Sequence, residues 1–278
     1  WIKGRTGTSA PYVDHCLFDT LRGPEKIIRA NDSGSTLLDI NSLLSFDADG
    51  YATGGSGVTN VSGTNYVAWN FSSQPGFFDI QTWTGDGVEG RQIPHNLGST
   101  PGMIMIKRTG GGGSENWVVY HKEMGIGQNL TLNENYASNS FAYVTAVSDT
   151  AFNVSMQFQT NGNDSSATYV AYLFADNPSN QIKCGSYTGN GTSGASSNAT
   201  HLDFDPEWLL VKNIDSNGSN WSIVDSTRGN LYQLNANTTE AESNTGSNGL
   251  ALFTGHFQAY GSSVDHNKSG DKYIYVAI

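Results

Sequence analysis

The sequence predicts an all-β protein made of three tandem repeats of about 104 residues, each an antiparallel β-sandwich or jelly-roll-like module, with the first repeat truncated. Two observations predict this fold class. Short apolar or alternating runs are bounded by clusters of Gly, Asn and Ser, and helical periodicity does not persist anywhere in the chain. The same sequence elements also recur at a nearly constant spacing.

The clearest repeated element is a Tyr-rich run, found at residues 66–71, 169–174 and 273–278. Its leading tyrosines, Tyr66, Tyr169 and Tyr273, are expected at equivalent core positions. An apolar run ending in lysine recurs in the same way, at Lys3, Lys107 and Lys212. Two more pairs are residues 83–87 with 187–191, and Asn116-Trp117 with Asn220-Trp221. A unit of this size can bury its own core, so each repeat is expected to be a small domain.

Breaks after the Tyr-rich run give repeats at 1–71, 72–174 and 175–278. Within them, residues 103–106, 117–120 and 208–211 are expected to be strands. The first repeat lacks the opening residues of the other two, and we expect these to precede Trp1 in a longer chain. The unpaired edges near Trp1, Ile2 and Tyr12 are then expected to need a cover, supplied by those residues or by a neighbouring chain.

Composition excludes several classes of protein. The chain has 14 Lys+Arg and 25 Asp+Glu, a net charge of −11, which argues against non-specific nucleic-acid binding. No apolar run is long enough to span a membrane as a helix, so no membrane insertion is expected. Cys16 and Cys184 fall at non-equivalent places in the repeat and are predicted to be reduced, buried thiols.

Two glycine motifs fit the dinucleotide-binding pattern, at residues 85–90 and 189–194. That pattern binds a pyrophosphate only where a helix follows, because the helix N-terminus holds the anion. Pro94 follows the first motif and residues 195–198 do not favour a helix after the second. We therefore predict tight turns between strands and no nucleotide cofactor.

Three acidic motifs have features of metal or catalytic sites. Residues 47–50 resemble the start of a calcium loop but lack the closing Glu, so a turn between two strands is expected. Asp203, Asp205 and Glu207 would share one face of a strand and could bind a cation or act as an acid pair, although a solvated edge is the favoured interpretation. Asp19 and Arg22 recur as Asp225 and Arg228, and an ion pair that orients a turn is expected there.

No enzyme signature is present. The six histidines show no metal-binding spacing, and no nucleophile elbow, phosphate-binding loop or paired-cysteine motif occurs. Asn-x-Ser/Thr sequons, such as those at Asn60, Asn70, Asn153 and Asn190, are expected by chance in a chain of this composition. The sequence assigns no catalytic, cofactor-binding or metal-ligating residue, and the ligand-binding residues stay unassigned.

Taken together, the motifs carry a resemblance to a known family. These motifs cover essentially all of residues 1–278. They are the apolar run into Lys, Trp-x-(Val/Ile)-(Tyr/Val), Asp-x-x-Arg-Gly, Ser-Phe-x-x-Asp-Gly-Tyr, Gly-x-x-Tyr-Val-Ala-Trp, Tyr-Thr-Gly-Asn-Gly and Pro-His-Asn-Leu-Gly-Ser-Thr-Pro. This set resembles a repeat domain of tailed-bacteriophage virion proteins of the marine and cyanophage type, which are described as tail fibre or structural proteins. The middle repeat departs from the pattern, with His121 to Gly125 in place of Asp-x-x-Arg-Gly.

The resemblance implies a non-enzymatic virion protein, a tail-fibre or surface-appendage segment that displays loops for host attachment. It implies identical subunits, with a homotrimer favoured, together with other virion proteins and a host-surface glycan or protein as partners, on the surface of an extracellular particle. Two alternatives stay open: a carbohydrate-binding or lectin-like module of a secreted protein, and a capsid decoration protein.

Overall fold

The computed structural model describes residues 1–6, 13–162, 166–194, 198–246 and 248–278, and these residues confirm the all-β prediction. They form 23 strands and one short 3-10 helix, η1 (Pro178–Asn180), with no helix long and apolar enough to cross a membrane. All strand pairs are antiparallel, and each of the six sheets takes its described strands from one of three ranges, 1–71, 72–174 or 175–278. These ranges are called the first, middle and last segments below.

The first segment contains a five-stranded sheet and a separate hairpin. The sheet has the order β4 (Leu37–Leu38), β3 (Gly23–Arg29), β2 (His15–Asp19), β1 (Ile2–Gly4) and β7 (Tyr66–Ala68). The hairpin consists of β5 (Leu43–Asp47) and β6 (Gly50–Thr53).

The middle segment has a four-stranded and a three-stranded sheet. The larger sheet has the order β11 (Val118–His121), β10 (Met103–Gly110), β14 (Thr168–Phe174) and β8 (Phe78–Thr84). The smaller one has the order β12 (Val144–Val147), β13 (Ala151–Val154) and β9 (Arg91–Pro94).

The last segment also has a larger and a smaller sheet. Its larger sheet has the order β15 (Lys183–Thr188), β23 (Lys272–Ala277), β17 (Trp208–Asn213), β18 (Ser222–Asp225), β19 (Tyr232–Asn235) and β20 (Ser243–Asn244). Its smaller sheet has the order β16 (Asn198–His201), β22 (His256–Ala259) and β21 (Leu250–Phe253).

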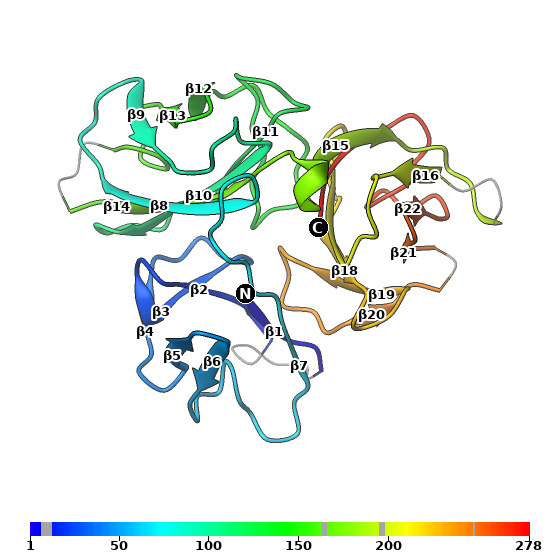
Figure 1. The fold of residues 1–278 in the computed structure, drawn as a ribbon, viewed down its shortest axis with the longest axis horizontal. Coiled ribbons are helices and arrows are strands. Elements are labelled where there is room, and N and C mark those ends of the chain that lie inside the picture. The colour runs from blue at the N-terminus through cyan, green and yellow to red at the C-terminus, as the bar shows by residue number, and fades with distance from the viewer. Residues whose placement is uncertain (7–12, 163–165, 195–197, 247) are drawn as a thin grey trace.

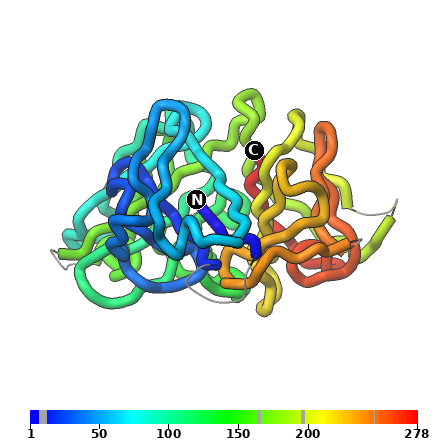
Figure 2. Tube along the Cα trace, turned by 90° about the horizontal axis from the view of Figure 1, so that it is seen from below, coloured from blue at the N-terminus to red at the C-terminus, as the bar shows by residue number. Residues whose placement is uncertain are grey.

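The three segments form three lobes around a common centre, with the N- and C-termini close to that centre (Figure 1). A view turned by 90° shows the lobes side by side in one layer rather than stacked along a rod (Figure 2). The largest apolar core joins them, because it contains Trp69 from the first segment, Tyr172 from the middle and Trp208 from the last. A second core, which includes Phe257 and Tyr273, lies within the last segment.

This arrangement explains why the central strands are continuous apolar runs rather than alternating ones. Strand β10 is buried at every position from Met103 to Thr109, and β17 is buried throughout. In β17, Leu210 belongs to the shared core and Leu209 and Val211 belong to the second core, so the two faces of this strand are covered by different cores. A strand covered on both faces has no position at which a polar side chain can reach water.

The Tyr-rich runs form strands at similar places, beside the strands that end in lysine. Tyr169 and Tyr273 are fully buried, as expected, but Tyr66 is only partly buried. The prediction of a core position is therefore wrong for Tyr66. The strands β8 and β15, which cover β14 and β23, have no counterpart beside β7 in the described residues.

The expectation of exposed apolar surface at Trp1 and Ile2 is also wrong. Both side chains are buried, because β1 pairs with β2 on one side and β7 on the other. Trp1 also packs edge-on against Trp69, with ring centroids 5.7 Å apart. Tyr12 lies outside the described residues.

Candidate functional site

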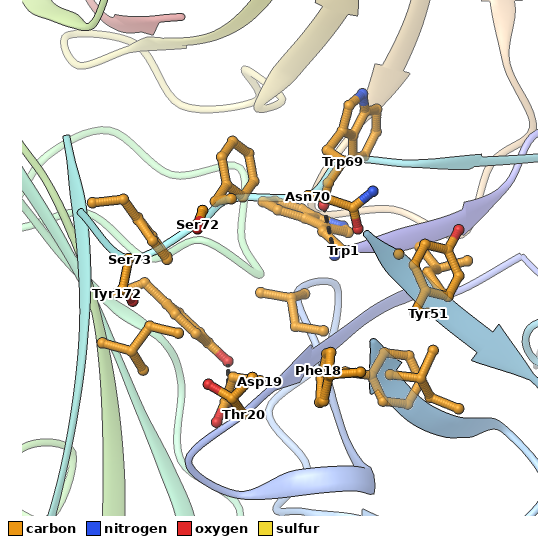
Figure 3. Close-up of a pocket in the computed structure, with 18 of the residues that line it drawn as sticks. Trp1, Phe18, Asp19, Thr20, Tyr51, Trp69, Asn70, Ser72, Ser73 and Tyr172 are labelled. Carbon is orange, nitrogen blue, oxygen red and sulfur yellow. Dashed lines mark hydrogen bonds between the residues drawn. The ribbon is translucent and has the colours of Figure 1, made fainter. Parts of the chain in front are cut away.

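A cavity of about 520 Å³ opens between the sheet of the first segment, its β5–β6 hairpin and the middle segment. Apolar rings and small polar groups line it together. The labelled lining residues in Figure 3 are Trp1, Phe18, Asp19, Thr20, Tyr51, Trp69, Asn70, Ser72, Ser73 and Tyr172. Aromatic walls with a few polar groups are typical of a binding site, and the existing hydrogen bonds of those polar groups decide what each can still bind.

Asp19 is the most deeply buried acid of the cavity, and its carboxylate is already hydrogen-bonded to neighbouring side chains and backbone. Its carboxylate accepts hydrogen bonds from the backbone N–H of Arg22 at 2.8 Å and from Arg22 Nε at 2.5 Å. Tyr172 of the middle segment donates its hydroxyl to the same carboxylate at 2.8 Å (Figure 3). Burial raises the pKa of Tyr172 well above its ordinary value, so the phenol stays a neutral donor.

Asp225 repeats these contacts between the last and first segments. Arg228 donates its backbone N–H at 2.9 Å and its Nε at 2.5 Å, while the indole Nε1 of Trp69 donates at 3.0 Å. Glu242 continues the network by accepting from Arg228 and from Arg5 of the first segment, at 2.9 and 2.8 Å. Burial alone would raise the pKa of Glu242, but the hydrogen bonds from Arg5 and Arg228 lower it below its ordinary value.

His121 stands at the matching place in the middle segment, where the sequence departs from Asp-x-x-Arg-Gly. Its Nδ1 accepts from the backbone N–H of Glu123 at 3.2 Å, as a carboxylate would, and its Nε2 lies 3.1 Å from the carbonyl of Tyr275 in the last segment. The Nε2–H tautomer satisfies both contacts. Burial lowers the pKa of His121 to about 4, which keeps the ring neutral.

A second set of contacts joins the segments in the same cyclic order. The indole of Trp117 donates to the carbonyl of Arg29 at 2.8 Å, and that of Trp221 donates to the carbonyl of Thr131 at 3.0 Å. His15 occupies the corresponding position in the first segment. Its ring lies beside the backbone of Asn235, although its Nε2 makes no hydrogen bond of good geometry.

These contacts join the middle segment to the first, the last segment to the middle, and the first segment to the last. Together they form a closed ring of contacts between segments. The ring places buried acids and bases where they hold the segments together. The carboxylates of Asp19 and Asp225 each accept hydrogen bonds from an arginine and from an aromatic side chain of another segment, and each is directed away from solvent. None of these groups is arranged as a nucleophile next to a free base.

The other acidic motifs lie in turns. Residues 47–50 form the β5–β6 turn, as predicted, with Asp47 opposite Gly50. Asp203, Asp205 and Glu207 lie in the connection between β16 and β17 rather than in a strand, so the prediction of a shared strand face is wrong. All three are exposed, as the favoured interpretation expected. The described residues contain no group of three His, Cys, Asp or Glu side chains placed to hold a metal ion.

The glycine motifs are turns between sheets. The first is followed by strand β9 and not by a helix, as predicted. A Cβ on Gly85 would lie 2.2 Å from the carbonyl oxygen of Gly162, and Gly87 has a φ of +66°, which explains both glycines. The second motif precedes β16, but residues 195–197 lie outside the described part of the chain.

Both cysteines are free and buried, as predicted. Burial raises the pKa of Cys16 to about 12 and that of Cys184 well above its ordinary value, so neither is a reactive thiolate at neutral pH.

Sequence reasoning missed the buried lysines. Lys3, Lys107 and Lys212 are fully buried, and each donates from Nζ to a backbone carbonyl, of Val13, Glu115 and Asn213 respectively. Burial lowers the pKa of each to about 8. Their recurrence at the end of an apolar run was the signal that could have revealed them.

Sequence reasoning also missed three recurring asparagines. Asn31, Asn133 and Asn237 each accept a backbone N–H, from His15, Trp117 and Trp221. The shared contact shows that His15 corresponds to the two tryptophans.

Comparison with curated proteins and with solved structures finds no match. One family model does match, and it covers the whole of residues 1–278. The chain therefore belongs to the family described as Domain of unknown function (DUF7483).

Proposed function

We propose that this chain is a non-enzymatic structural protein of a bacteriophage virion, a tail-fibre or surface-appendage segment that displays loops for attachment to a host surface. Its partners are identical subunits in a homotrimer, other virion proteins and a host-surface glycan or protein. The motif resemblance across residues 1–278 supports this role. The trimer is carried by that resemblance alone, since Trp1 and Ile2 are already covered within the chain.

The observation that carries the structural role is the closed ring of contacts between segments. Asp19, Asp225 and His121 recur at corresponding strand ends, and each binds a group of another segment. Ionisable groups that form such contacts stabilise a rigid scaffold, and they are then not available for catalysis. Loops on a rigid scaffold can then vary without loss of the fold.

We further propose that the chain consists of three copies of one β-sandwich module of about 104 residues, divided at 1–71, 72–174 and 175–278, with the first copy incomplete. The corresponding contacts of Asn31, Asn133 and Asn237 support this division. So does the pairing of β1, β10 and β17 with β7, β14 and β23.

Antibodies against the purified chain test the virion role. Phage particles whose genome encodes this sequence should bind the antibody on tail appendages in electron micrographs, and the antibody should reduce adsorption to host cells. Particles lacking the chain by mass spectrometry, or labelled only on the capsid shell, would contradict the tail-appendage assignment. Labelling confined to the shell would favour a capsid decoration protein.

A carbohydrate-binding module is the second candidate, and exposed aromatic side chains of the middle segment favour it. Tyr136 and Phe141 lie on the long connection between β11 and β12, with 59% and 42% of their surfaces exposed. Sugar faces stack on such rings. A glycan array probed with the intact chain and with Tyr136→Ala tests this. Binding of a glycan that Tyr136→Ala abolishes would favour a lectin-like role.

A further inference from the structure

Arg22 and Arg228 lie in the turns after β2 and β18, and their guanidinium groups make the same contacts except for one. Each donates Nε to the aspartate three residues before it, at 2.5 Å. Each also donates Nη2 to a carbonyl of the preceding strand, at 3.3 and 3.2 Å. Arg228 donates Nη1 to the carboxylate of Glu242 at 2.9 Å, whereas Nη1 of Arg22 is buried without a hydrogen-bond partner among the described residues.

Thr36 has the place in the first segment that Glu242 has in the last. The backbone N–H of Thr36 donates to the carbonyl of Thr109 at 3.0 Å, and that of Glu242 donates to the carbonyl of Arg5 at 2.9 Å. Thr109 and Arg5 each follow a buried lysine of the apolar run by two residues. The threonine side chain is shorter than glutamate and neutral, so it supplies neither the length nor the charge that Arg228 receives.

A cavity of about 470 Å³ lies at this place, where β3 and β4 of the first segment approach β8 and β14 of the middle segment (Figure 1). Arg22, Lys26 and Thr36 line it from the first segment. Its volume is in the range of small-molecule sites, about 300–1000 Å³. None of its described lining residues belongs to β1, β7 or the β5–β6 hairpin, so its walls do not depend on what lies beside those strands.

The charged groups of this cavity are cations. Arg22 and Lys26 line it, and none of its described lining residues is acidic. In the last segment, Glu242 accepts from two cations, Arg5 at 2.8 Å and Arg228 at 2.9 Å. A carboxylate in the cavity would likewise lie beside an arginine and a second positive charge, and hydrogen bonds between such charged groups are the strong ones.

Hydroxyl groups form the opposite wall. Thr84 of β8 and Thr168 of β14 are directly opposite each other in the register, and Thr82 lies two residues from Thr84 on the same face. All three side chains are exposed. The hydroxyl of Thr109 lies 2.9 Å from that of Thr168. Hydroxyls both donate and accept hydrogen bonds, so this wall suits a ligand that carries hydroxyls of its own.

We propose that this cavity is a binding site for a small hydroxylated carboxylate, of the class of the uronic acids. The carboxylate of the ligand takes the place that Glu242 has in the last segment and accepts a hydrogen bond from Arg22 Nη1. Lys26 supplies the second positive charge, and the threonines of β8 and β14 pair with the hydroxyls of the sugar ring. The proposal depends on the correspondence of Thr36 with Glu242, and it does not depend on the virion role.

Glucuronate is the probe, titrated into the intact isotope-labelled chain and followed by NMR. It should bind saturably with one site per chain and a Kd on the order of 1 mM. Glucose has a similar ring without the carboxylate, and acetate has the carboxylate without the ring. Each should bind about tenfold more weakly or less. Equal affinity for glucose would overturn the role of the carboxylate, and equal affinity for acetate would overturn the sugar class.

Thr36→Glu tests the place of the carboxylate. The new side chain should pair with Arg22 as Glu242 pairs with Arg228, and it should therefore fill the site from within. Glucuronate binding should be lost, and the melting temperature should rise by about 2 °C or more. Unchanged affinity in this variant would overturn the proposal.

Ser138→Glu is the matched control in the middle segment. Ser138 has the corresponding place there, because its backbone N–H donates to the carbonyl of Ile214 at 2.9 Å, and Ile214 also follows a buried lysine by two residues. Met124 stands where the other segments have the arginine. This variant should bind glucuronate as the original chain does and should not gain stability.

Lys26→Gln gives a second test that does not alter the buried contacts, since the Lys26 side chain is exposed. Loss of one of the two positive charges should weaken glucuronate binding by about fivefold or more, and added salt should weaken binding to the original chain in the same direction. Circular dichroism shows that each variant is folded. Absence of saturable glucuronate binding by the original chain, or equal binding by Lys26→Gln, would overturn the proposal.

Discussion

At the scale of single residues, burial decides which side chains this protein can use for chemistry. Asp19, Asp225 and His121 lie at corresponding strand ends, and each forms hydrogen bonds both within its own segment and with another segment. Buried polar groups are tolerated only when they are paired. The sequence predicted only an ion pair that orients a turn at Asp19 and Asp225, and the structure adds to each carboxylate a contact with another segment.

The neutral state of His121 predicts a pH-dependent stability. Its pKa is about 4 in the folded chain against an ordinary value of 6.5, so the unfolded chain takes up the proton first as pH falls. The stabilisation is complete above pH 6.5 and is lost between pH 6.5 and 4, by about 3 kcal/mol. Urea unfolding between pH 7 and 4.5 measures this loss. His121→Gln should reduce the slope, and an unchanged slope would contradict the role of this ring.

The three tyrosines of the Tyr-rich runs should differ in what they contribute. Tyr169→Ala should lower the free energy of unfolding by about 3–5 kcal/mol, because the side chain is fully buried and leaves a cavity. Tyr66→Ala should cost less, about 1–2 kcal/mol, because its ring is partly exposed. Chemical denaturation of both variants measures the two values. Equal losses would show that Tyr66 is covered in solution.

At the scale of elements, the sequence was sufficient for the strands and insufficient for their contacts. Apolar runs such as residues 103–106 predicted strands that the structure confirms. The motif at residues 85–90 was correctly predicted to be a turn, because Pro94 excludes a helix. Trp69 and Asp225 are 156 residues apart and share no local pattern, so nothing in the sequence indicated their hydrogen bond. Pairings of this kind depend on how completed lobes dock.

The turn between β8 and β9 should depend on glycine at position 85. Gly85→Ala should destabilise the chain by about 2 kcal/mol or more, because the new Cβ would lie 2.2 Å from a backbone oxygen that cannot move freely. Gly55→Ala is the matched control, since a Cβ there meets nothing within 4 Å. Thermal melting compares the two. Equal stability would mean that the turn rearranges.

At the scale of the whole molecule, a shared core links the three lobes. Trp69, Tyr172 and Trp208 come from three different segments and belong to one apolar cluster. We therefore expect one cooperative unfolding transition, with equal calorimetric and van't Hoff enthalpies. Trp221→Phe, which removes the indole hydrogen bond to Thr131, should lower the melting temperature and keep one transition. Separate transitions in scanning calorimetry would show that the lobes unfold independently.

The placement of all three lobes on one chain has a genetic consequence. In a ring of identical subunits, every substitution appears three times and alters every face at once. Here His121 stands in the middle lobe at the place that Asp19 and Asp225 have in the other two. A mutation in this gene thus alters one face and leaves its two neighbours as they were. Selection can act on each face separately, so one molecule can evolve three different surfaces at fixed angles to one another.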